Sequence, residues 1–205
     1  MVALADEVVR RLRTELPHNL SYHDLSHTVD DVVPEALRLA DAEGISGIDR
    51  VRLHAAALLH DIGYTRSTVD HELVGAALAM ELLPAFGFDS ADVAVIVGLI
   101  LATRLGHLPV SLSEAVIADA DLAVVGSEDF WRRHRALQRE IASLGTPHED
   151  LSWTELQSRF LRGHVFHTET ARAKGEPGKR ANLRRVATRI RRLERLEAAK
   201  RVRKR

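Results

Sequence analysis

The chain has 205 residues, of which 45% are hydrophobic and 4% aromatic, and its formal net charge is zero. It contains no cysteine, which excludes disulfides, thiolate metal sites and a cysteine nucleophile. No apolar run reaches the roughly 18 residues of a membrane span, and the N-terminal stretch is too charged for a signal peptide, so we expect a cytoplasmic protein with no membrane partner.

Apolar residues recur with helical spacing along most of the chain. Alanine and leucine dominate, and alternation of β-branched residues is scarce, so we expect an all-α helical bundle. The periodic stretches predict helices over residues 2–16, 22–40, 49–61, 71–83, 93–101, 113–122, 127–144 and 153–161. Ser21 is expected to cap the second helix, Pro34 to kink or restart it, and Gly63 to stop the third. Residues 164–178 are expected to be irregular.

The C-terminal stretch differs in charge from the rest of the chain. From Lys179 onward 13 residues are basic and 2 acidic, whereas the preceding part has 16 basic and 27 acidic residues. Apolar residues at helical spacing predict an amphipathic helix here, namely Leu183, Val186, Ile190 and Leu193. We expect one domain over 1–178 and a basic helix over 179–205 that packs on it or extends from it. Such a helix could bind nucleic acid electrostatically. A solvated arginine face is the preferred interpretation, because no aromatic residue interleaves the charges.

Histidine and aspartate gather at the ends of apolar helices. His23 and His27 are four residues apart, so on a helix they share one face. His60 and Asp61 follow one apolar segment, and Asp121 follows another. Imidazoles and carboxylates without thiolates suit Mn²⁺, Fe²⁺, Co²⁺, Ni²⁺, Mg²⁺ or Zn²⁺. The sequence therefore predicts a divalent metal site in an apolar wall, where unpaired carboxylates would be costly.

The order of these residues carries a family resemblance. His27, His60, Asp61 and Asp121 follow the His…His-Asp…Asp signature, and the chain resembles the HD-domain superfamily of metal-dependent phosphohydrolases. The resemblance covers roughly residues 23–121, and residues 119–126 and 180–183 are similar to a bacterial group of predicted phosphohydrolases of unknown substrate. It implies that these four residues ligate the metal. It further implies that Asp119 orients a histidine or a water.

The resemblance also implies a proton donor. His23 matches the histidine that protonates the leaving group in cyclic-nucleotide phosphodiesterases, which makes it a candidate general acid. This chain has Asp24 where that branch has asparagine, and it lacks that branch's large domain, so cyclic-nucleotide specificity does not carry over. A stacking or capping role for His23 remains open.

Two further histidines match positions at which binuclear members add metal ligands. If His71 and His107 both bind, the site holds two ions bridged by Asp61. Glu72 could then position or deprotonate a water, and Arg104 could neutralise phosphate charge. The alternatives are a helix-cap histidine, a surface-loop histidine and a glutamate that only complements the helix dipole.

These observations favour a metal-dependent phosphohydrolase, a phosphomonoesterase or phosphodiesterase that cleaves the ester of a nucleotide or small phosphorylated metabolite with one or two divalent ions. A binuclear iron oxygenase, similar to inositol oxygenase, would require His71 and His107 as ligands. A non-enzymatic nucleic-acid-binding module would act through the basic tail. Substrate, metal identity and oligomeric state stay open.

Overall fold

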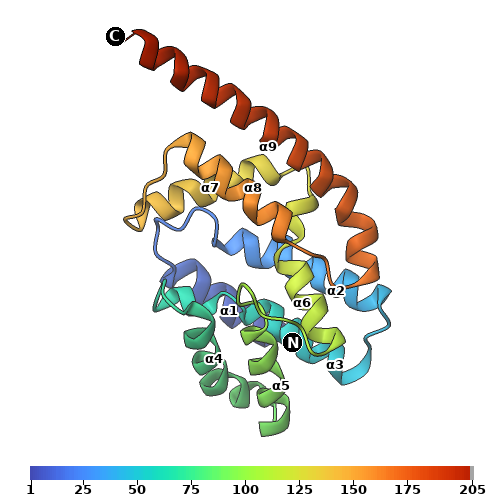
Figure 1. The fold of residues 1–205 in the computed structure, drawn as a ribbon. Helices are drawn as coiled ribbons and strands as arrows, with labels where there is room; N and C mark the ends of the chain where they lie inside the picture. The colour runs from blue at the N-terminus through green and yellow to red at the C-terminus, as the bar shows by residue number, and fades with distance from the viewer. Residues whose placement is uncertain (204–205) are drawn as a thin grey trace. The chain divides into compact units, whose positions relative to one another are not determined.

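The computed structural model describes residues 1–203, and over that range every regular element is helical, which confirms the predicted all-α class (Figure 1). The α-helices are α1 (Val2–Glu15), α2 (Val33–Ala42), α3 (Gly47–Leu59), α4 (His71–Leu82), α5 (Ser90–Leu101), α6 (Leu112–Asp121), α7 (Phe130–Ser143), α8 (Asp150–Gly163) and α9 (Glu169–Arg203). Within the described range no helix is long and apolar enough to cross a membrane.

The helices group into two compact units. Unit 1 comprises residues 1–123 and 167–171, and unit 2 comprises residues 124–166 and 172 onward. The chain thus leaves unit 1 after α6, returns to it briefly, and leaves again along α9. The division at residue 178, which was inferred from charge, stays a prediction.

The core of unit 1 surrounds the C-terminal half of α3. Five consecutive residues there, Ala55 to Leu59, are at most 2% exposed. Three of the five are alanines, whose small side chains let neighbouring helices approach on every side, and α3 contacts both α2 and α5. Helix α4 packs on α5 (Figure 1). A helix end buried this deeply delivers the two residues that follow it, His60 and Asp61, into the interior.

Gly63 works by close approach rather than as a helix stop. It lies in a 3₁₀ turn, η2 (Ile62–Thr65), and it is not among the glycines with positive φ. A Cβ atom on Gly63 would lie 1.9 Å from the backbone oxygen of His71 and 2.8 Å from the nitrogen of Gly75. A Cβ atom on Gly75 would in turn lie only 3.4 Å from Gly63 N. This glycine pair lets the start of α4 lie against η2, which brings His71 to Asp61.

The segment before α2 also differs from its prediction. Helical structure begins at Leu25 rather than near Ser21, and residues His27–Val32 form a π-helical stretch, η1. The side chain of Asp24 serves as the cap, because its Oδ1 accepts hydrogen bonds from His27 N and Ser26 Oγ, both at 2.9 Å. Pro34 lies in the first turn of α2, where its missing N–H costs little. Short π-helical segments often mark functional positions.

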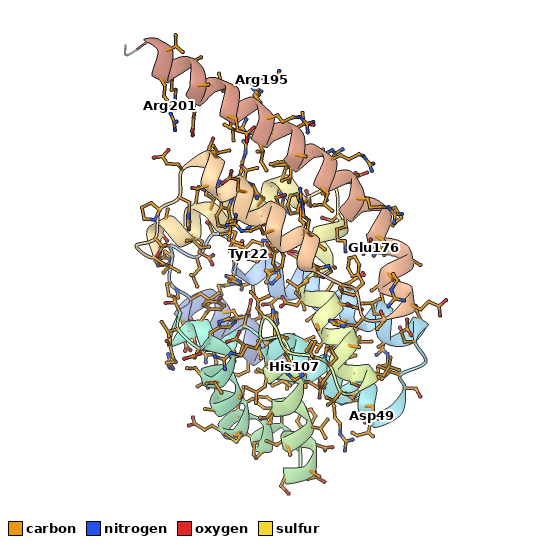
Figure 2. The ribbon with its side chains drawn as sticks, in the orientation of Figure 1. Tyr22, Asp49, His107, Glu176, Arg195 and Arg201 are labelled. Atoms are coloured by element: carbon orange, nitrogen blue, oxygen red, sulfur yellow. The ribbon has the colours of Figure 1, made fainter. Side chains whose placement is uncertain are left out.

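Helix α9 begins ten residues before the predicted start at Lys179. Gly175, Pro177 and Gly178 read as helix breakers in the sequence, yet all three lie inside α9. In unit 2 the glycines permit close packing: a Cβ on Gly178 would lie 1.8 Å from Gly126 O, and one on Gly175 would enter the ring of Phe166. Asn182 fastens the same contact, since its Nδ2 donates to the backbone oxygens of Val125 and Ser127. Arg195 and Arg201 lie on the last turns of α9 (Figure 2).

Candidate metal centre

Three potential metal ligands from three distant segments meet in unit 1. Donor atoms of His27, His60 and Asp121 all lie within 4.8 Å of one another. His27 Nε2 is 3.2 Å from Asp121 Oδ1, and His60 Nε2 is 3.7 Å from the same oxygen. Asp61 completes the group, with its Oδ2 lying 3.7 Å from His27 Nε2 and 3.3 Å from His60 Nε2. The four residues that the signature singles out are therefore brought together.

Each of these residues lies at the boundary of a helical element. His27 opens the π-helical segment η1, His60 and Asp61 immediately follow α3, and Asp121 is the last residue of α6. Side chains at such boundaries can converge, because the chain direction changes there while the adjoining helices remain fixed by the core. His27, His60 and Asp61 are at most 5% exposed, whereas the Asp121 side chain is 18% exposed and marks the accessible side.

Two of the converging atoms lack a hydrogen bond. His60 Nδ1 lies 2.8 Å from Ala57 O, so a proton on Nδ1 donates to that carbonyl and leaves the Nε2 lone pair facing the cluster. Within the described range, buried His60 Nε2 and Asp61 Oδ2 have no hydrogen-bonding partner. Orphaned buried polar atoms are rare and costly, and here two atoms whose lone pairs suit a metal ion point to one place. The residues present therefore fit a bound divalent cation.

The charges of the cluster compensate one another. Burial disfavours protonation of His60, but the carboxylates of Asp61 and Asp121 outweigh burial and raise its pKa. Burial alone would likewise raise the pKa of Asp61, but the imidazoles, His60 foremost, outweigh it and hold that pKa well below its usual range. Asp61 thus stays ionised in spite of its burial. A cation requires this ionised carboxylate, and it would take the place of the proton that the carboxylates favour on His60.

The second oxygen of Asp61 faces another histidine. His71 Nε2 lies 3.6 Å from Asp61 Oδ1, and His71 Nδ1 lies 3.5 Å from Glu72 Oε2. Burial lowers the pKa of His71 despite the two carboxylates, so this imidazole is neutral near pH 7. Glu72 is placed to hold the Nδ1–H tautomer of His71, which turns Nε2 toward Asp61.

An aromatic wall that the sequence did not predict borders the histidines. The rings of Tyr64 and His71 are near-parallel with centroids 4.0 Å apart, and those of Tyr64 and His23 are 4.5 Å apart. Tyr64 Oη lies 3.5 Å from His23 Nε2, and Tyr22 packs against both His23 and His27. One signal was available: the chain has only two tyrosines, and both lie here.

Two predicted site residues are engaged elsewhere. His107 Nε2 lies 2.8 Å from Glu114 Oε2, its side chain is 34% exposed, and it joins no group of three potential ligands among residues 1–203. Arg104 forms an exposed ion pair with Asp70, at 2.8 Å. These partners hold both side chains of the loop after α5, and the structure does not bring them into the cluster.

Asp119 has a different role from the one predicted. Its Oδ1 accepts from His167 N at 2.8 Å, and its Oδ2 accepts from the backbone N and the hydroxyl of Thr168 at 2.7 and 2.8 Å. Both oxygens are thus used to hold residues 167–168 rather than to orient a histidine or water at the metal cluster. This contact could not be predicted, because the donors come from a segment about 48 residues farther along the chain.

Comparisons with known proteins match the part of the chain that carries most of this cluster. A family profile described as an HD domain matches residues 32–123, a stretch that contains His60, Asp61 and Asp121 but begins after His27. A bifunctional uridylyltransferase/uridylyl-removing enzyme of Ruegeria pomeroyi is 32% identical over 97 residues, which cover 42% of this chain and 10% of that protein. The match thus spans about a tenth of the relative's length. No solved structure matches the chain. The chain is therefore similar to HD domains over residues 32–123, and this match includes the helix ends that carry His60, Asp61 and Asp121 of the buried cluster.

Proposed function

We propose that this protein is a metal-dependent phosphohydrolase that cleaves a phosphate ester of a nucleotide or another small phosphorylated metabolite. The observation that carries the proposal is the convergence of His27, His60, Asp61 and Asp121, with His60 Nε2 and Asp61 Oδ2 buried and without hydrogen-bonding partners among the described residues. These four residues would hold a divalent ion such as Mn²⁺, Fe²⁺, Co²⁺, Ni²⁺, Mg²⁺ or Zn²⁺. Such an ion, when bound, polarises a phosphoryl oxygen and makes water a better nucleophile.

In this proposal His23 donates a proton to the leaving oxygen of the ester. Its ring is half-buried, lies 5.9 Å from the ring of His27, and stacks on the ring of Tyr64. Tyr64 limits the motion of His23 by stacking and by its hydroxyl, which is near His23 Nε2. General acid catalysis of this kind typically contributes about 10²–10⁴-fold to a rate.

A one-ion centre is the form that we propose. Of the two further histidines predicted as ligands, only His71 approaches Asp61 Oδ1, because His107 is hydrogen-bonded to Glu114. A binuclear iron oxygenase would need both histidines, so this arrangement favours hydrolysis. The name of the aligned relative includes removal of uridylyl groups, which is cleavage of a phosphate ester and supports a nucleotide-like substrate class.

The first experiment measures bound metal and turnover together. Purified wild type, Asp61→Asn and the exposed control Asp70→Asn are compared by elemental analysis and by hydrolysis of phosphomonoesters and nucleotide phosphodiesters. We expect about one divalent metal ion per chain and measurable hydrolysis in wild type and Asp70→Asn, and neither in Asp61→Asn. Hydrolysis retained by metal-free Asp61→Asn would contradict the mechanism.

A second comparison tests the role of His23. His23→Ala should keep its metal but lose about 10²–10⁴-fold in turnover of an alkyl phosphate ester. The loss should be much smaller for a nitrophenyl ester, because that leaving group needs no proton. Equal losses on the two esters would assign His23 a structural role.

A further inference from the structure

Unit 2 contains a polar cavity that the proposed function does not use. It lies between α7, α8 and α9 and has a volume of about 220 Å³. Its lining combines cationic, aromatic and amide side chains, chiefly Trp131, His134, Arg135, Gln138, Arg139 and Arg189. All of these residues belong to unit 2.

Two of the arginines lack a counter-ion. Arg135 and Arg139 are one turn apart on α7, so their side chains line the same face, and neither forms an ion pair within the described part of the chain. The third, Arg189, is paired with Asp150, with 3.0 Å between Nη2 and Oδ2. The cavity wall therefore carries a net positive charge. Adjacent unpaired guanidinium groups repel each other unless an anion lies between them.

The other side chains that line the cavity suit a ligand with a planar ring and a hydrogen-bonding group. Trp131 is half-buried and lies one turn before Arg135 on the same face of α7. His134 is 6% exposed, and its Nδ1 has no hydrogen-bonding partner in the described range. Burial lowers the pKa of His134 to about 4, so its ring stays neutral near pH 7 and does not add to the charge. An indole face beside two free guanidinium groups can contact a planar ring and an attached anion at once.

We propose that this cavity is a second binding site, for a small phosphorylated molecule that carries a planar ring, such as a nucleoside monophosphate. Arg135 and Arg139 bind the phosphate, and Trp131 contacts the ring. The site is separate from the metal cluster in sequence and in unit, so it can be tested whether or not the protein hydrolyses phosphate esters.

The experiment uses the full chain after metal has been removed with a chelator, which silences the metal cluster. Adenosine monophosphate and inorganic phosphate are titrated calorimetrically into wild type, Arg135→Gln/Arg139→Gln, and the control Arg132→Gln. Arg132 is on the same helix, but it pairs with Asp129 and does not line the cavity. We expect at least a tenfold loss of affinity in the double variant and less than a twofold change in the control. No binding by wild type, or equal losses in the two variants, would overturn the proposal.

Two further variants test the parts of the site separately. Asp150→Asn removes the only carboxylate in the lining, so adenosine monophosphate should bind several-fold more tightly, a gain that damage to the fold cannot produce. Trp131→Leu should reduce the affinity for adenosine monophosphate to that for inorganic phosphate. Weaker binding in Asp150→Asn would overturn the assignment of an anion. An unchanged preference for the nucleotide in Trp131→Leu would overturn the assignment of the ring contact.

Discussion

Two pairs of buried polar residues, one pair in each unit, are used in opposite ways. In unit 2, buried Asn182 and Lys179 fasten the chain to itself. Asn182 Nδ2 donates to Val125 O and Ser127 O, and Lys179 Nζ donates to His164 O. In unit 1, buried His60 and Asp61 leave one atom each without a hydrogen bond, and both atoms face the same place. Satisfied polar groups specify a packing arrangement, whereas converging unsatisfied ones specify a ligand.

The same contrast holds for glycine. Each unit contains a close contact that no side chain would allow, Gly63 against α4 in unit 1 and Gly126 against Gly178 in unit 2. The first contact places His71 beside Asp61, and therefore serves the site. The second contact sets the path of α9 and serves the fold alone. Four predictions test this comparison, from the largest expected effect to the smallest.

The glycine contacts should be the most sensitive positions. Gly63→Ala and Gly178→Ala should each destabilise the protein by about 3 kcal/mol or more, because backbone must move to admit the methyl group. Only Gly63→Ala should also lower metal content. The control is Gly98→Ala in α5, which has nothing within 4 Å of its Cβ and should gain about 0.5–1 kcal/mol. Chemical unfolding and elemental analysis measure the two effects, and normal metal content in Gly63→Ala would break the comparison.

Metal should stabilise unit 1 through its ligands. Adding Mn²⁺ at about 100 times its dissociation constant should raise the free energy of unfolding by about 2.7 kcal/mol, and His60→Ala should lose this gain. Circular dichroism reports on all helices, whereas the only two tryptophans, Trp131 and Trp153, report on unit 2. We expect Mn²⁺ to shift the unfolding midpoint measured by circular dichroism more than the midpoint measured by tryptophan fluorescence. An equal gain in His60→Ala would mean that Mn²⁺ binds elsewhere.

Acid should weaken unit 2 through His134. Burial lowers the pKa of His134 from 6.5 to about 4, so the unfolded chain binds the proton more readily than the native one. Its contribution to stability is complete above pH 6.5 and is lost as the pH falls toward 4. His134→Gln should therefore flatten the pH dependence of unfolding, followed by tryptophan fluorescence between pH 7 and about 4. An unchanged pH dependence would contradict the expected role.

The exposed residues of the loop after α5 should matter least. His107→Ala should leave metal content unchanged, and Arg104→Ala should alter stability by no more than about 1 kcal/mol, because its ion pair with Asp70 is half-exposed. Elemental analysis and thermal unfolding check both variants. A loss of about half the metal in His107→Ala would restore the two-ion alternative, with His71→Ala as the matching variant.

The comparison also explains what could be predicted from the sequence. The four converging residues were predictable because their order is a family signature and because His60, Asp61 and Asp121 follow apolar segments. Tyr64, the Gly63–Gly75 contact and the true partners of Asp119 were not, since each depends on a contact whose donor or neighbour lies elsewhere in the chain. Helix α9 was predicted ten residues too short because Gly175 and Gly178 have the same local signal whether they break a helix or admit a neighbouring backbone.

The carboxylate of Asp119 has a consequence for dissecting the protein. It is 1% exposed, lies two residues before Asp121, and receives all three of its hydrogen bonds from residues 167–168. A fragment that ends at residue 123, where the family match ends, would retain every proposed metal ligand. It would, however, leave the buried Asp119 carboxylate without its hydrogen-bond donors. We therefore expect residues 1–123 not to fold autonomously, because their last helix is completed by a segment that the chain supplies only after a detour of more than forty residues.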